Sequence, residues 1–384
     1  MKILELTLEF EPFVMAGLGS FVSKLIPAIA NQTNELSFDV FAYGDDHIPK
    51  YSSGKNVQVY RVQQKNILVN DVYWDIIGYN ISLLETVVKH YNKNAESFDL
   101  IHFHDWFVAP AAFALKNIYE KPLVGNIHQT VYGQALGVLS ERRIPIHKIQ
   151  AEIIVRSDHV ICNSNFMKKE IERVFVAETN KISIIPNAIN LDNSTDKKKE
   201  GAPPLLLFVG RLEEVKGLDH LLSLALILKN KGLNFLLKIV GKGSREVQLR
   251  EKCKSLNLDR HVLFIGEKKK EALLLEYASA DILLFPSIYE PFGMVLLEAM
   301  SFSLPVVSFN LGAAGEIIED GKSGFLIAPF DIQVFAEKVE LLLNNGNLRI
   351  ELGNNAYERL KNYYTMDKII PHYVKIFTKL GQVK

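Results

Sequence analysis

A pair of cations follows an apolar run in the second half of the chain. In the segment Phe208–Gly217, which reads FVGRLEEVKG, these cations are Arg211 and Lys216. Fixed cations can stabilise the negative charge that a diphosphate acquires when its bond to a sugar breaks, which in many enzymes is a task of Mg²⁺. The alternative is that both cations pair with Glu213 and Glu214 at the surface. The first interpretation predicts a diphosphate site that requires no metal.

A second segment, Ser287–Met300, reads SIYEPFGMVLLEAM and also follows an apolar run. We expect Pro291 to start a helix here, so that the free amides of the next three residues face an anion beyond the carboxyl end of a strand. These residues are Phe292, Gly293 and Met294.

Two glutamates belong to the same segment. Glu290 precedes the expected helix, and Glu298 lies about two turns into it. This placement does not make them a catalytic pair, so we expect each carboxylate to bind hydroxyl groups. The alternative for Glu290 is a solvated helix cap.

The first half of the chain carries three polar segments at the ends of expected strands. Glu11–Ser20 is a glycine loop in which backbone near Gly17 could approach a phosphate or sugar. Ile101–Trp106 includes Asp105, and Asn126–Thr130 includes His128. We expect these segments to face one cleft, although a histidine at a strand end is more often structural than catalytic.

Histidine and cysteine spacing gives no indication of a metal site. The ten histidines and two cysteines show no zinc-type pattern. His102 and His104 alternate along one expected strand, and we expect their side chains on opposite faces of the sheet. We therefore predict no metal.

Composition narrows the class of protein. The 384 residues include 44 basic and 44 acidic side chains, so neither nucleic acid nor an anionic membrane is indicated as a main partner. No apolar run reaches the about 18 residues of a membrane span, and residues 1–7 indicate a strand with a buried glutamate rather than a signal peptide. A reducing cytoplasm is the expected location.

Short apolar runs alternate with segments of helical period, which predicts the α/β class with parallel sheets. Expected helices include Phe21–Ala30, Phe166–Val174 and an amphipathic Met366–Leu380. The expected strands are Ile3–Phe10, Phe38–Tyr43, Val57–Val62, Leu100–His104, Leu123–Ile127, His159–Asn163, Ile182–Ile185, Leu205–Gly210, Phe235–Gly241, Val262–Gly266, Asp281–Pro286 and Pro305–Ser308.

The polar stretch 191–203 divides the pattern into two halves and is expected to be a linker. The predicted domains are 1–190 and 204–362, each a doubly wound Rossmann-like sheet, with a cleft between them. Residues 363–384 form a last helical segment. The length of the chain agrees with two domains.

Three motifs in this order resemble retaining glycosyltransferases of the GT-B fold, family 4, which include glycogen and starch synthases. They are Gly210–Leu212 with Lys216–Gly217, Val240–Gly243, and Glu290–Gly293 with Glu298. The resemblance covers nearly the whole chain. It implies that residues 363–384 cross back to the first domain, which faces the acceptor, and that the second domain binds a nucleotide-diphospho-sugar as substrate, with no cofactor.

The resemblance also implies roles for single residues. Arg211 and Lys216 would bind the donor diphosphate, and Glu298 the ribose. Glu290 and the amides after it would bind the transferred sugar, and His128 its far hydroxyl. Gly17, Asp105 and Gly241 would line the donor site, and the binding amides are those of Phe292, Gly293, Met294 and Val295. The acceptor would attack from the face that the diphosphate leaves, without a protein nucleophile.

The first half resembles glycogen and starch synthases through Glu11–Phe13, His104–Trp106 and His128–Thr130. This implies glucose transfer from ADP- or UDP-glucose to an α-glucan. The loop reads AGLG at residues 16–19 where that group has a double glycine and a lysine, so the acceptor stays open.

Three alternatives remain. A family 4 enzyme for a cell-surface glycan or glycolipid would make peripheral membrane contact, for which Arg142–Arg143 and Lys168–Lys169 are candidates. A nucleotide-sugar 2-epimerase would share the fold without transferring sugar. A sugar-nucleotide sensor would bind the donor without any catalysis.

Overall fold

The computed structural model describes residues 1–14, 17–33, 35–44, 56–64, 72–94, 97–176, 179–191, 203–268 and 271–382. The chain folds as two compact units: unit 1 is Met1–Ala188 with Met366–Lys384, and unit 2 is Ile189–Thr365. Most of the expected linker, residues 192–202, lies outside the described residues, as does Ala16 of the glycine loop.

Unit 1 contains a parallel sheet with the strand order β3-β2-β1-β4-β5-β6-β7. The order reverses between β1 and β4, and such a switch point is where doubly wound sheets bind ligands beyond the carboxyl ends of the strands. The strands are β1 (Lys2–Leu6), β2 (Ser37–Tyr43), β3 (Val57–Val62), β4 (Leu100–His104), β5 (Leu123–Ile127), β6 (His159–Cys162) and β7 (Ile182–Ile184).

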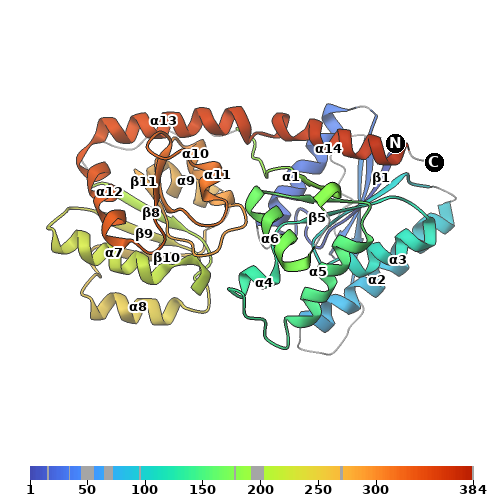
Figure 1. Cartoon of the computed structure of the whole chain (residues 1–384), viewed down its shortest axis with the longest axis horizontal. Coiled ribbons are helices and arrows are strands. Elements are labelled where there is room, and N and C mark those ends of the chain that lie inside the picture. The colour runs from blue at the N-terminus through green and yellow to red at the C-terminus, as the bar shows by residue number, and fades with distance from the viewer. Residues whose placement is uncertain are drawn as a thin grey trace. The chain divides into compact units, whose positions relative to one another are not determined.

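Helices cover both faces of this sheet, which explains its apolar strands. One face packs against α1 (Gly17–Gln32) and α14 (Met366–Gly381), which lie side by side in Figure 1. The other face packs against α2 (Val72–Asn94), α3 (Ala109–Tyr119), α5 (Ile144–Arg156) and α6 (Asn165–Phe175). The short α4 (Val131–Gln134) and the 3-10 turn η1 (Thr179–Lys181) complete the described elements of the unit.

Unit 2 repeats this plan with the strand order β10-β9-β8-β11-β12-β13. The strands are β8 (Leu205–Val209), β9 (Leu236–Val240), β10 (Val262–Gly266), β11 (Ile282–Phe285), β12 (Val306–Phe309) and β13 (Gly324–Ile327). All their pairings are parallel.

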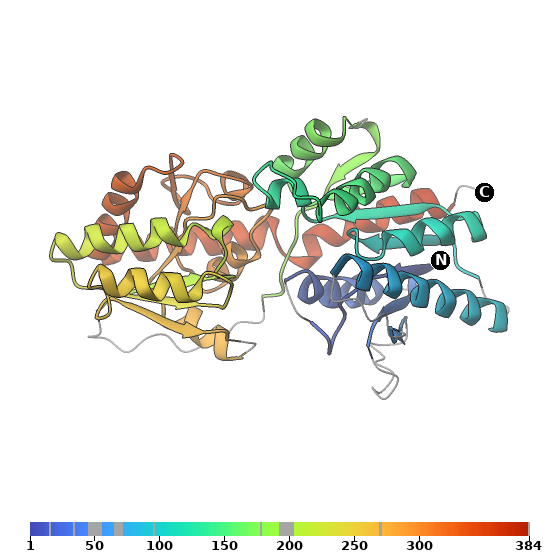
Figure 2. The same cartoon turned by 90° about the horizontal axis from the view of Figure 1, so that it is seen from below.

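Two groups of helices enclose the unit 2 sheet. One group packs on the hydrophobic core at one face of the sheet: α7 (Leu218–Asn230), α8 (Glu246–Ser255) and α12 (Ile332–Asn344). Figures 1 and 2 both show α7 and α8 side by side. The second group lies on the opposite face: α9 (Glu271–Ser279), α10 (Met294–Ser301), α11 (Ala314–Ile317) and α13 (Gly346–Tyr363).

The expected α/β class with two parallel sheets is confirmed, and each expected strand is present. The first strand is shorter than expected, because the chain turns after Leu6 and Phe10 instead forms an isolated antiparallel bridge with Phe13. Strand β13 was not expected from the sequence.

The last helix completes the core of unit 1. Its apolar side, which includes Ile369, Ile370 and Phe377, is buried in the same cluster as α1 and the facing strands. The Tyr373 hydroxyl accepts a hydrogen bond of 3.0 Å from Asn126 Nδ2 at the end of β5. Residues from the two ends of the chain therefore form one hydrophobic core.

Candidate active site

Lys216 and Glu290 form an ion pair at the carboxyl end of the unit 2 sheet. Their Nζ and Oε2 atoms are 2.6 Å apart, and the side chains are only 17 % and 13 % exposed. Lys216 ends the 3-10 turn η2 (Glu214–Lys216), and Glu290 lies in the loop between β11 and α10. Lys216 therefore pairs with Glu290 rather than with Glu213 or Glu214.

Backbone contacts between two loops hold this pair in place. Val215 O, in the turn before Lys216, accepts a hydrogen bond of 2.8 Å from Ile288 N. The next residue, Gly217, has φ +68°, and a Cβ atom there would lie 2.0 Å from Pro286 O. On the other side, Glu290 O accepts a hydrogen bond of 3.0 Å from Ala313 N. Only glycine permits so close an approach of backbones at position 217.

Arg211 and Gly241 lie where the ends of β8 and β9 meet. Leu212 N donates to Lys242 O at 2.9 Å, and a Cβ atom on Gly241 would lie 1.9 Å from Gly210 O. Among the residues that the structure describes, none forms a hydrogen bond or ion pair with the exposed guanidinium of Arg211. An exposed cation thus stands at a strand end beside tightly packed glycine loops.

The helix after Glu290 does not start where the sequence predicted. Helix α10 begins at Met294, not at Pro291, because Gly293 has φ +105° and precedes the helix as its N-cap. Leu296 N already donates to Gly293 O. The first helical amides are therefore those of Met294 and Val295, whose N–H groups lie at the positive end of the helix dipole.

Glu298 has a partner of its own. Its Oε2 accepts a hydrogen bond of 2.6 Å from the hydroxyl of Tyr277 on α9. Burial and the carboxylate of Glu298 raise the pKa of Tyr277 well above its usual range, so this hydroxyl remains a donor. The two glutamates of the motif thus have different partners.

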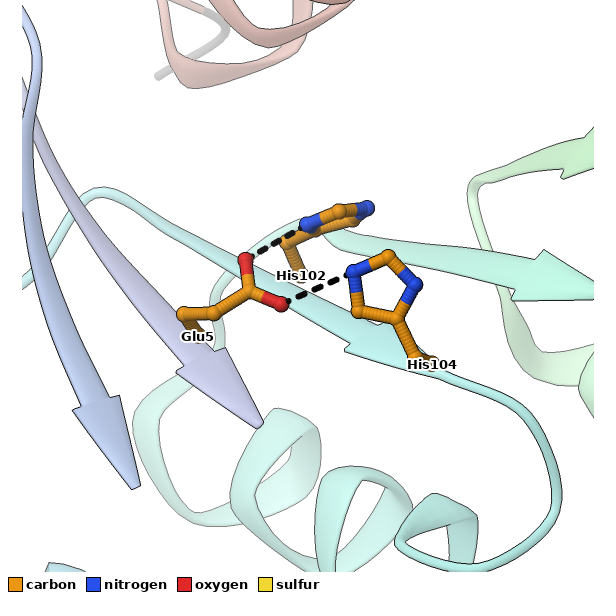
Figure 3. A group of neighbouring side chains, drawn as sticks. All are labelled: Glu5, His102 and His104. Carbon is orange, nitrogen blue, oxygen red and sulfur yellow. Dashed lines mark hydrogen bonds and ion pairs between the residues drawn. The ribbon is translucent and has the colours of Figure 1, made fainter. Parts of the chain in front are cut away.

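In unit 1, a carboxylate and three histidines form a connected group. Glu5 Oε2 lies 2.6 Å from His102 Nδ1, and Glu5 Oε1 lies 3.1 Å from His104 Nε2 (Figure 3). His104 Nδ1 lies 3.0 Å from His128 Nε2. The expectation that His102 and His104 point to opposite faces was wrong, because successive residues of a strand alternate and residues two apart share a face.

The backbone of His128 is held from both sides. Its N–H donates to Asp105 Oδ1 at 3.4 Å, and its carbonyl oxygen accepts from Asn163 Nδ2 at 3.0 Å. Asp105 is fully buried with φ +59°, a conformation that aspartate tolerates. Because the loops after β4, β5 and β6 supply these residues, the structure brings Asp105 and His128 together.

Glu5, His102 and His104 also have the donor types of a metal site, the one such group within the described ranges. Zinc with bonds of about 2.0 Å would separate neighbouring ligand atoms by about 3.3 Å in tetrahedral geometry. The 2.6 Å between Glu5 and His102 is shorter and is a normal charge-assisted hydrogen bond. The geometry therefore favours a shared proton over a metal ion.

The glycine loop is anchored from β3. The Arg61 guanidinium donates to Phe10 O at 2.9 Å and to Glu11 O, and it lies 5.7 Å from the centre of the Phe13 ring. Gly17 is the exposed first residue of α1. The loop therefore has a fixed entry and an accessible glycine at the start of the helix.

Both halves of the chain match known families of sugar-transferring enzymes. Residues 192–359 match the family described as Glycosyl transferases group 1, and residues 16–193 match the family described as Glycosyltransferase Family 4. The chain is a family 4 glycosyltransferase. The expected family is thereby confirmed.

Curated relatives span nearly the whole glycosyltransferase. An uncharacterized glycosyltransferase of Methanocaldococcus jannaschii is 29 % identical over 392 residues, which cover 98 % of each chain. Glycogen synthase of Mycobacterium tuberculosis is 28 % identical over 376 residues, covering 94 % of this chain and 90 % of the relative.

Solved structures share the fold of this glycosyltransferase. Sucrose-phosphate synthase of Thermosynechococcus elongatus superposes with a TM-score of 0.82 at 20 % identity and full coverage of both chains. Anabaena HepE in complex with UDP-glucose superposes with a TM-score of 0.74 at 19 % identity, covering 99 % and 100 %. This similarity confirms the expected GT-B fold.

No helix in the described part of the glycosyltransferase has the length and hydropathy of a membrane span. The longest described helix, α2, runs over Val72–Asn94 and includes charged residues.

Two contributors to the histidine group of the glycosyltransferase were not predicted from the sequence. Glu5 was expected to be buried, but its partner was not identified. The register of β1 and β4 gives Glu5 its partner, since Glu5 pairs with His102 across these two strands. Tyr373 could not be connected to Asn126, because they lie 247 residues apart in sequence. A charged residue in a buried strand was the signal that pointed to Glu5.

The stability of the glycosyltransferase should respond to the charge of Asp105. Burial raises the pKa of this carboxyl to about 8, whereas an unfolded aspartate has a pKa of about 3.9. Between these two pKa values the folded state keeps the proton, whereas the unfolded state has released it. The contribution of Asp105 to stability is therefore lost as pH rises from about 4 to about 8. Asp105→Asn cannot titrate and tolerates the same backbone conformation. Urea unfolding at pH 5.5 and pH 8 should show the wild type losing more stability than the variant. An equal loss in both proteins would contradict the assignment.

Proposed function

We propose that this glycosyltransferase moves glucose from ADP- or UDP-glucose onto an α-glucan, with retention of configuration and without a metal ion. The observation that carries this proposal is the partly buried Lys216–Glu290 ion pair at the carboxyl end of the unit 2 sheet, where a doubly wound fold binds its ligand. A cation and a carboxylate fixed in contact suit a substrate that offers a diphosphate and a sugar hydroxyl side by side.

In this proposal Arg211 and Lys216 bind the diphosphate, and Glu298 binds the ribose. Glu290 holds the hydroxyls of the transferred sugar, while His128 contacts its far hydroxyl. The backbone at Phe292, Gly293, Met294 and Val295 approaches the sugar and phosphates, and Gly17, Asp105 and Gly241 line the donor site. The roles agree with the accessibility of Arg211 and with the glycine contacts at Gly241.

The proposed reaction depends on positioning and electrostatics. The acceptor hydroxyl attacks from the face that the diphosphate leaves, and the leaving phosphate oxygen takes its proton. The cations stabilise the charge that develops on the leaving group, which is where fixed charges contribute most. No protein side chain forms a bond to the sugar.

Two similarities support the choice of donor and acceptor. One relative, matched over 90 % of its length, is named glycogen synthase. Anabaena HepE, with the same fold, was solved with UDP-glucose. Glucose as the transferred sugar and a glucan as the acceptor agree with both. The segments around His104–Trp106 and His128–Thr130 resemble glycogen and starch synthases.

Donor turnover by the purified chain tests the proposal. ADP-glucose, UDP-glucose, GDP-mannose and UDP-N-acetylglucosamine are each supplied in the presence of EDTA, with and without glycogen. We expect glucose to enter glycogen from ADP- or UDP-glucose, and an α-linked product by proton NMR.

Other outcomes separate the alternatives. Donor turnover without elongation of glycogen would contradict the glucan and direct attention to a cell-surface glycan or a lipid acceptor. Inversion of the sugar at carbon 2 would indicate an epimerase. Donor binding without any turnover would indicate a sensor, and turnover that EDTA abolishes would contradict metal independence.

A further inference from the structure

A chain of polar contacts leads from the centre of the unit 1 sheet to His128. Glu5, His102 and His104 are fully buried, whereas His128 is partly exposed. Glu5 contacts both other buried side chains, and only His104 contacts His128. The group lies on the sheet face that α14 covers, since the ring centres of His102 and Phe377 are 5.0 Å apart. His104 is thus the link between a buried carboxylate and a partly exposed imidazole.

Glu5 carries a negative charge in the folded protein. Burial alone would raise the pKa of this carboxyl, but His102 and His104 outweigh it and lower the pKa below its ordinary value. Glu5 is therefore ionised near neutral pH, and an ionised carboxylate only accepts hydrogen bonds. His104 Nε2 lies 3.1 Å from Glu5 Oε1 in an ion-pair contact. A bare lone pair on Nε2 would face the negative carboxylate oxygen, so we place the ring proton on Nε2.

The proton on His104 Nε2 determines which nitrogen of His128 is protonated. Burial lowers the pKa of His104, so the ring carries one proton, and that proton is on Nε2. Its Nδ1 is then a bare acceptor, and the neighbouring His128 Nε2, 3.0 Å away, must be the donor. Burial, followed by the influence of His104 and His102, lowers the pKa of His128 well below its usual range, so this ring is also neutral. The remaining nitrogen, His128 Nδ1, has no proton.

We propose that Glu5 and His104 are positioning residues that hold the proton of His128 on Nε2, so that Nδ1 accepts a hydrogen bond from a hydroxyl of the transferred sugar. This inference rests on the proposed function. A bare Nδ1 makes the enzyme selective for sugars that carry a hydroxyl donor at that position. Fluorine at the same position can accept a hydrogen bond but cannot donate one. Its partial negative charge would also face the lone pair of Nδ1.

The proton positions can be measured without any substrate. Nitrogen-15 NMR of the chain labelled at histidine distinguishes a bare imidazole nitrogen from a protonated one, and His128→Gln identifies the signals of His128 by their loss. We expect a protonated Nε2 and a bare Nδ1 on His128 at neutral pH. A proton on Nδ1 would overturn the proposal, whatever sugar the enzyme transfers.

A series of donors tests the consequence for selectivity. In each donor one sugar hydroxyl is replaced by hydrogen or by fluorine. The position that His128 contacts is the one at which the His128→Gln variant no longer distinguishes the natural donor from the substituted donors. At this position either replacement should lower the kcat/KM of the wild type by about 10- to 100-fold. The fluorinated donor should be no better than the deoxygenated one. A fluorinated donor that clearly outperforms it would show that His128 donates, which overturns the proposal.

Glu5→Gln tests the role of the carboxylate. The amide can donate as well as accept, so a proton on His104 Nε2 is no longer required, and His128 should populate both tautomers. The ratio of the two donors' rates should then shift toward fluorine, and this ratio does not depend on how much of the variant is folded. The matched control is Glu152→Gln on α5. The exposed carboxylate of Glu152 pairs with Arg156, and its replacement should leave the ratio unchanged.

A folded Glu5→Gln variant with the wild-type tautomer would overturn the role of Glu5. If no donor is turned over, the proposed function fails, while the NMR measurement still decides the tautomer.

Discussion

Replacing Lys216 with alanine should lower kcat by about a hundredfold, the size expected for the loss of one charge that stabilises a transition state. In the folded protein Nζ of Lys216 lies 2.6 Å from Glu290, with little exposure of either side chain. Its removal takes away the cation proposed for the leaving diphosphate and leaves the carboxylate without this partner. Arg211→Ala should have an effect of similar size, because the exposed guanidinium is the second proposed cation.

The matched control for Lys216 is another ion pair of unit 2. Lys231 Nζ lies 2.5 Å from Glu340, with both side chains about a third exposed. Lys231→Ala should leave kcat near that of the wild type, and the loss of stability should be small, as for other solvated pairs. Steady-state rates at saturating donor, with circular dichroism to verify folding, make the comparison. Near-normal rates for both Lys216→Ala and Arg211→Ala would contradict the diphosphate role.

Replacing Gly217 with alanine should destabilise unit 2 by about 2–4 kcal/mol, the combined cost of a left-handed backbone and of overpacking. The added Cβ atom would lie 2.0 Å from Pro286 O, a backbone atom that cannot move without shifting the loop after β11. This loop carries Glu290, so turnover should fall together with stability.

Gly232 separates the two contributions. Its φ of +73° is nearly that of Gly217, +68°, but no atom lies within 4 Å of the Cβ position. Gly232→Ala should therefore show the backbone cost alone, about 1–2 kcal/mol, and unchanged turnover. Denaturant unfolding of the two variants measures the difference. Equal losses of stability would show that the contact with Pro286 is unimportant.

Much of the fold could be predicted, because a buried parallel strand can be recognised from its own short stretch of sequence. Each buried strand appears as a short apolar run, and polar residues after such a run must lie at the edge where ligands bind. Lys216, Glu290 and His128 were placed in this way at strand ends. Their sequence neighbours were sufficient evidence.

Contacts between distant segments could not be read in this way. The Lys216–Glu290 pair joins residues 74 positions apart, and the sequence suggested nearer glutamates as partners for the cation. The start of α10 depends on the backbone of Gly293, whose positive φ no residue pattern requires. Both features follow from how one loop packs on another, which local propensity does not determine.

The packing of α14 on unit 1 also affects the order in which the protein can fold as it is made. A ribosome completes residues 189–365 before it reaches Met366, so the strands and helices of unit 2 are all available first. The face of the first sheet that carries Glu5 and His102 is covered only in part, by α1, until residues 366–381 emerge, and Asn126 has no Tyr373 to bind until then. The nascent chain therefore holds an incomplete first unit, with apolar surface exposed, through most of its synthesis. The part of the chain that is made first is the last to be finished.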